Sequence, residues 1–77
     1  MMPLPQSIVY AEANWEADEA RPGHGTWWAT VLASDHTTQL VSRGPYPDQS
    51  AAQHAAVLIA EKLAQHVKNL EWRKWEK

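Results

Sequence analysis

The residues best suited to chemistry are a group of acids near the N-terminus. Glu16, Asp18 and Glu19 precede His24, and carboxylate and imidazole groups are common ligands of divalent metal ions. A calcium loop needs alternating oxygen ligands, a central glycine and a distal glutamate, and this spacing does not supply them. We therefore expect a solvated acidic loop that holds no metal ion.

Other residue types that take part in catalysis are scattered. His36, His54 and His66 form no i, i+4 pair and no HExxH pattern. The Gly-His-Gly stretch at 23–25 precedes a predicted strand, whereas a phosphate loop precedes a helix. The chain has no cysteine, which excludes disulfides, thiolate zinc sites and cysteine nucleophiles. We expect no catalytic residue and no cofactor, so the protein is not expected to be an enzyme.

Aromatic and cationic residues near the C-terminus form the second candidate site. Trp72 and Trp75 alternate with Arg73 and Lys74, and the chain holds five tryptophans in all. Tryptophan and arginine dominate the hot spots of protein interfaces, so this segment predicts a surface that contacts a partner protein. The alternative is that both tryptophans fold back onto the sheet as core residues. The same side chains would also suit base stacking and phosphate neutralisation in a nucleic-acid complex.

The element that must position this segment is a long helix over residues 50–70. Ser50, followed three residues later by Gln53, fits a capping box. Apolar residues recur at spacings of three and four, as on the buried side of a helix: Ala52, Ala56, Ile59, Leu63, Val67 and Leu70. Trp72 and Trp75 continue off this buried side.

Three strands are predicted before the helix. Alternation of side chains places them at residues 8–16, 26–34 and 37–43, after an N-terminal arm at 1–7. Short connections favour antiparallel pairing, because parallel strands need long crossovers. The predicted fold is α+β, a two-layer β-β-β-α arrangement. A three-stranded antiparallel meander packs on one long C-terminal helix, and residues 71–77 form an aromatic and basic tail.

The two faces of this sheet differ. The face favoured to meet the helix carries Val9, Ala11, Ala13 and Trp15 with Trp27, Ala29, Val31 and Ala33, although either face of the strand at 26–34 could do so. The other face would be open and would show Tyr10, Trp28, Leu32 and Leu40, which is too apolar for a monomer. A partner protein or a second copy of the chain is expected to cover it. The predicted partner-binding residues are Trp72, Arg73, Trp75, Lys74, Tyr10 and Trp28.

Length and composition limit the possible classes of protein. Seventy-seven residues make one domain, and a net charge of −2 argues against a dedicated nucleic-acid binder. The N-terminus lacks the pattern of a signal peptide, and no apolar run approaches the length of a membrane span. With the absence of cysteine, these features favour a cytoplasmic protein.

The order of the predicted elements resembles known small folds. Three strands and a long helix, with Glu12 on the first strand and Glu61 on the helix, resemble the front half of a ribonuclease H-like fold. That resemblance implies several carboxylates around two metal ions. One of these carboxylates comes from a later strand that this chain does not reach. The predicted helix phase also turns Glu61 outward. HicB-type antitoxins are similar in size and strand order, and their aromatic pair resembles Trp27–Trp28. No functional residue is carried over from either family.

The sequence therefore favours a small non-enzymatic regulator or inhibitor, antitoxin-like or of phage or mobile-element type, that occupies a surface of another protein. One alternative is a nucleic-acid-binding module that uses Arg43, Lys68, Arg73 and Lys74. A second alternative is a homodimer with a structural role.

The protein-binding interpretation makes a direct prediction about the C-terminal tryptophans. Alanine at Trp72 and Trp75 should abolish partner binding with little loss of thermal stability, because contact residues contribute to the complex more than to the fold. Thermal unfolding and binding of the purified variant measure the two effects. A large loss of stability would show that both side chains belong to the core.

Overall fold

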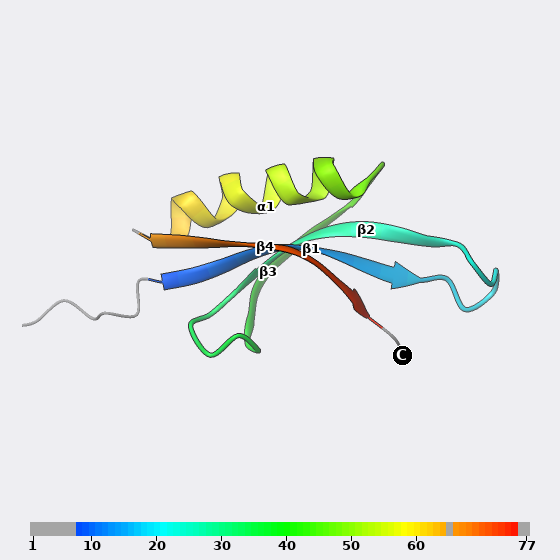
Figure 1. Cartoon of the computed structure of the whole chain (residues 1–77), viewed down its shortest axis with the longest axis horizontal. Coiled ribbons are helices and arrows are strands. Elements are labelled where there is room, and N and C mark those ends of the chain that lie inside the picture. Colours follow the sequence, from blue (N-terminus) through cyan, green and yellow to red (C-terminus); the bar gives the residue numbers. More distant parts are fainter. Residues whose placement is uncertain (1–7, 65, 76–77) are drawn as a thin grey trace, which may run out of the picture.

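The computed structural model describes residues 8–64 and 66–75, the last of these by its backbone only. Helix α1 lies across one face of a four-stranded sheet, so the domain is a small α+β unit with two layers (Figure 1). No helix in these two ranges is long and apolar enough to cross a membrane. The predicted arm at 1–7 and the end of the predicted tail at 76–77 lie outside the described residues. The elements are β1 (Ile8–Ala17), β2 (Gly25–Leu32), β3 (Gln39–Tyr46), α1 (Gln49–Leu63) and β4 (His66–Trp75).

The sheet is mixed, with strand order β3-β2-β1-β4. The antiparallel pairs β1–β2 and β2–β3 agree with the predicted meander. The remainder of the predicted fold is wrong, because β4 follows the helix and pairs parallel with β1. Helix α1 is therefore the crossover between β3 and β4, which run in the same direction, and it does not end the fold.

The error arises in the segment after Leu63. Val67 and Leu70 continue the spacing of the helix, and no glycine or proline marks its end. The helix nevertheless stops, and the last helical hydrogen bond runs from the Ala64 N–H to the Ala60 carbonyl at 3.1 Å. Without β4, one edge of β1 would carry a row of unpaired backbone groups. Pairing with β1 satisfies these groups, which a longer helix would not do.

The helix also begins before the predicted cap. Asp48 is the N-cap, and its Oδ1 accepts the Ala51 N–H at 2.8 Å. Ser50 lies inside the first turn, so the predicted capping box is wrong. Aspartate and serine are both favourable N-caps, and local propensity does not choose between them. Gln53 instead reaches the sheet, where its Nε2 donates to the Ala11 carbonyl at 3.4 Å.

The core is a seam of small residues between α1 and the sheet. It consists of Val9, Ala11, Ala29, Val31, Ala56 and Ala60, which confirms the predicted helix-facing side of β1 and β2. Alanine on both layers lets the helix lie close to the strands. The buried side of the helix differs from the predicted one, because Ala60 is fully buried while Leu63 is 50% exposed.

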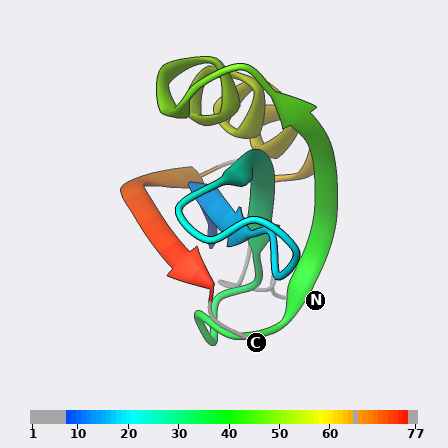
Figure 2. The same ribbon diagram turned by 90° about the vertical axis from the view of Figure 1, so that its right-hand side faces the viewer.

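The opposite face of the sheet, predicted to be open, is curled and largely covered. We call it the concave face. Figure 2 shows β3 and β4 descending on either side of β1 and β2, away from the helix. The turn at 33–38 approaches β1, where the rings of His36 and Tyr10 lie 3.9 Å apart. Leu32 is fully buried there, and Leu40 alone of the apolar residues expected on this face is exposed.

The helix start provides a test of this correction. Asp48→Ala should lower the free energy of unfolding by about 1 kcal/mol, because the Ala51 N–H loses its acceptor. Ser50→Ala should change it by only a few tenths of a kcal/mol, because alanine suits a helix interior. Urea denaturation of the two variants measures the difference, and the reverse order would restore Ser50 as the cap.

Candidate functional site

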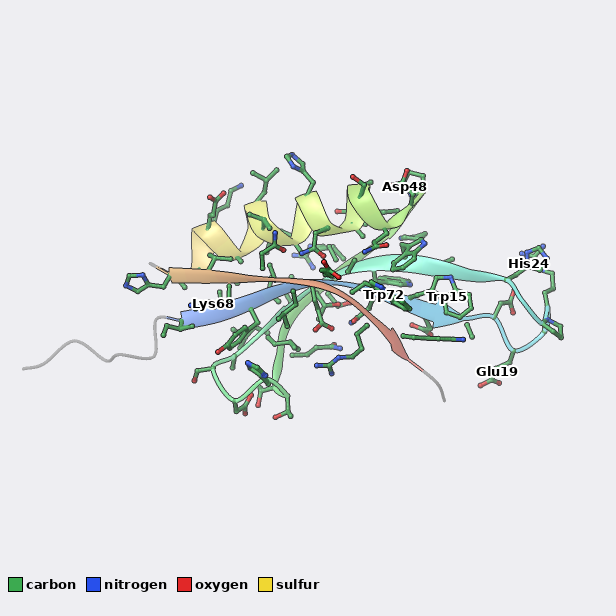
Figure 3. All side chains as sticks on the ribbon, viewed as in Figure 1. Trp15, Glu19, His24, Asp48, Lys68 and Trp72 are labelled. Carbon is green, nitrogen blue, oxygen red and sulfur yellow. The ribbon has the colours of Figure 1, made fainter. Side chains whose placement is uncertain are left out.

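Three tryptophans from three strands meet on the helix side of the sheet. Trp15 of β1 pairs with Trp27 of β2, and Trp72 of β4 lies opposite Ala13 on the same side. The rings of Trp27 and Trp72 are 5.8 Å apart and inclined at 74°, an edge-to-face arrangement that favours both. Figure 3 shows Trp15 and Trp72 below Asp48, where the helix begins. We call Trp15, Trp27 and Trp72 the tryptophan surface.

The tryptophan surface is held in place but not covered. Trp72 is 49% exposed, and Trp15 and Trp27 are partly buried. The rings border an open pocket of about 330 Å³, which Gln49 and Lys74 complete. Because the β1–β2 hairpin extends past the start of α1 (Figure 1), the helix leaves this end of the sheet bare. An exposed tryptophan beside such a pocket is a candidate contact residue.

A β-bulge decides which side chain of β4 joins the tryptophan surface. Asn69 lies opposite Ala11 and Trp72 lies opposite Ala13, so two residues of β4, Leu70 and Glu71, face the single residue between them on β1. The extra residue shifts the alternation of the strand by one. Trp72 is thereby placed on the helix side, and the next residue points to the concave face.

Glycine makes room for two of the tryptophan rings. The indole of Trp15 lies on Gly25, where an added Cβ would come within 2.5 Å of the ring. On the concave face Trp28 lies on Gly44 in the same way, and its Nε1 donates to Thr26 Oγ1 at 2.8 Å. A strand glycine often marks such a close approach. Gly25, which lies just before the predicted strand at 26–34, therefore helps to position the tryptophan surface.

A groove of about 950 Å³ runs from the tryptophan surface along α1, between the helix and β4. Two glutamines of α1 form hydrogen bonds across the groove to β4. Gln49 Nε2 donates to the Glu71 carbonyl at 3.2 Å, and Gln53 Nε2 donates to Asn69 Oδ1. The groove shares Gln49 and Trp72 with the tryptophan pocket, so the two form one continuous surface.

Arg73 fixes β4 from the concave face. Its Nε lies 3.5 Å from Glu12 Oε2, and its Nη2 donates to the His36 carbonyl at 3.5 Å. Glu12 is only 1% exposed, and this burial raises the pKa of its carboxyl although Arg73 and His36 act to lower it. Because Trp72 and Arg73 are neighbours in the chain, this ion pair holds the strand that presents Trp72 on the other face.

Buried polar groups surround this ion pair. Asn14 Nδ2 donates to Thr30 Oγ1 at 2.7 Å, and both residues are buried. Within the described part of the chain, Glu12 Oε2 and Asn14 Oδ1 accept no hydrogen bond. A buried acceptor without a hydrogen bond is costly, and for Glu12 Oε2 the ion pair with Arg73 at 3.5 Å offsets part of this cost.

The predicted partner-binding residues are divided between the two faces. Trp72 and Lys74 lie at the tryptophan surface, where Lys74 Nζ is 5.1 Å from the centroid of the Trp15 ring. Arg73, Tyr10 and Trp28 lie on the concave face and do not join them. The side chain of residue 75 lies outside the described residues. Trp15 and Trp27 also line the tryptophan pocket, although they lie on the side that the helix was expected to cover.

Neither the comparisons with known proteins nor the positions of the carboxylates identify a catalytic or metal site among the described residues. No protein-family model, curated protein or solved structure matches it. Glu61 is exposed on α1 while Glu12 is buried on the far side of the sheet, so these two carboxylates do not converge. Within residues 8–64 and 66–75, no three His, Asp or Glu side chains lie close enough to hold a metal ion.

Replacement of Glu12 tests the balance between burial and the ion pair. The folded state raises the pKa of this carboxyl above its ordinary value of 4.5, so it binds a proton more readily than the unfolded chain does. Glu12 therefore lowers stability at neutral pH, and this loss disappears as the pH falls through the raised pKa to about 4.5. Glu12→Gln should therefore raise the free energy of unfolding near neutral pH, and the gain should vanish near pH 4.

Urea denaturation across this pH range measures the gain. Glu61→Gln is the matched control, because it makes the same change at an exposed position. A lower stability of Glu12→Gln at neutral pH would show that the contact with Arg73 outweighs the cost of burial.

Proposed function

We propose that this chain is a small non-enzymatic binding module that acts as a regulator or inhibitor by occupying a surface of a partner protein. The observation that carries the proposal is the tryptophan surface itself. Three rings, far apart in the sequence, converge on one end of the sheet, and the outermost is 49% exposed. Tryptophan is the residue most enriched in interface hot spots, because its large apolar area is desolvated on binding.

The tryptophan surface is rigid enough to bind without a large loss of entropy. Its rings stand on strands that are paired along their backbones, and not on loops. Trp15 is seated on Gly25, Trp27 and Trp72 are in contact, and Arg73 anchors β4 from behind. A preorganised aromatic surface loses little side-chain freedom in a complex, which improves affinity for a given contact area.

The surrounding charge favours a protein partner over a nucleic acid. Asp48 and Glu71 line the groove, and Glu16 and Glu19 line a further pocket of about 390 Å³ at the hairpin end. These carboxylates would repel a phosphate backbone, which needs a basic surface. Among the described residues, one cation, Lys74, lines the tryptophan pocket.

Capture of a partner from cell lysate, followed by titration of the purified partner, tests the proposal. Trp72→Ala should weaken binding about 30-fold or more, as expected for a hot-spot residue worth about 2 kcal/mol. Leu40→Ala is the matched control, because it also removes a large apolar side chain that is about half exposed, 48% against 49% for Trp72. The control should bind as the parent protein does.

Two outcomes would contradict the proposal. In the first, the captured protein binds Trp72→Ala as tightly as the parent chain. In the second, sedimentation shows that the parent chain is a dimer and that Trp72→Ala makes it a monomer, so that the tryptophan surface pairs two copies of the chain.

A further inference from the structure

The groove between α1 and β4 has a marked chemical character. Among the described residues that line it, Asp48 and Glu71 are acids, and none is lysine or arginine. The other polar side chains in its lining belong to Gln49, Ser50, Gln53, His54 and Asn69. One end of the groove reaches the exposed ring of Trp72. Negative charge and an exposed aromatic face therefore occur together.

We propose that this groove receives a basic segment of the partner protein, with an arginine of that segment on the face of Trp72. The inference rests on the proposed function of the tryptophan surface, and it names the chemistry of what binds there. A guanidinium can stack on an indole and at the same time donate two parallel hydrogen bonds to a carboxylate. Trp72 provides the stacking face, and Asp48 and Glu71 line the same groove.

The chain already shows one contact of this type. Lys74 Nζ lies 5.1 Å from the centroid of Trp15, which is within the range of a cation–π interaction. Lys74 of the same chain therefore lies over the ring of Trp15, whereas Trp72 is 49% exposed to solvent. An ammonium cannot form the planar two-bond contact of a guanidinium, so arginine is preferred to lysine at Trp72.

A second copy of the chain matches this groove poorly, because the chain carries a formal net charge of −2. An acidic segment would meet Asp48 and Glu71 and would also be repelled.

Labelled peptides of single composition test the inference on the purified full chain. Fluorescein-labelled nona-arginine should bind, by anisotropy at physiological salt, about tenfold tighter than nona-lysine. Nona-glutamate should not bind. Trp72→Ala should remove the preference for arginine over lysine, because the stacking face is lost.

A pair of matched double variants separates the groove from overall charge. Asp48→Asn with Glu71→Gln removes two carboxylates from the groove and keeps a residue that can cap the helix. Glu19→Gln with Glu61→Gln removes two exposed carboxylates elsewhere. The groove variant should weaken nona-arginine binding about tenfold, and the control variant by less than about twofold. Circular dichroism verifies that both remain folded.

The outcomes distinguish this inference from the proposed function. Equal losses in the two double variants, or binding of nona-glutamate as tight as that of nona-arginine, would overturn the basic-segment inference. If Trp72→Ala still abolished partner capture in that case, the proposed function would stand alone. If Trp72→Ala captured the partner normally, the proposed function would fail as well.

Discussion

The structure depends on the pairing of β1 along both of its edges. β1 joins β2 antiparallel and β4 parallel, and its middle residues are buried on both faces. Ala11 and Ala13 are fully buried under the helix, while Glu12 and Asn14 are 1% and 4% exposed on the concave face. A strand enclosed in this way fixes the places of its neighbours. The helix covers one side, and Arg73 with the turn at 33–38 covers the other.

This central strand links the tryptophan surface to the buried acid. Alternation along β4 places Trp72 and Arg73 on opposite faces, and the β-bulge sets which of them faces the helix. We therefore expect the pair of Glu12 and Arg73 to contribute less as a source of stability than as a means of holding β4 in one register. Buried ion pairs are poor stabilisers in general, and their best-supported role is to select one arrangement among several.

The residues of the site were predictable in part. The richness in tryptophan and the position of Trp72 beside Lys74 drew attention to the C-terminal segment, and the favoured helix-facing side of the strands is confirmed for Val9, Ala11, Ala29 and Val31. The meeting of Trp15, Trp27 and Trp72 was not predictable. It requires the parallel pairing of β1 with β4, which are separated by most of the chain. Local sequence patterns do not predict such a long-range pairing.

The sequence by itself determined the three leading strands, their antiparallel order and the presence of one helix, because side-chain periodicity and short connections act over a few residues. Only the tertiary structure decided the state of residues 66–75. Their apolar positions suit a continued helix and a strand equally, and nothing nearby in the chain separates the two. The free edge of β1 decided it, since β4 satisfies backbone groups there that a longer helix would have left unpaired.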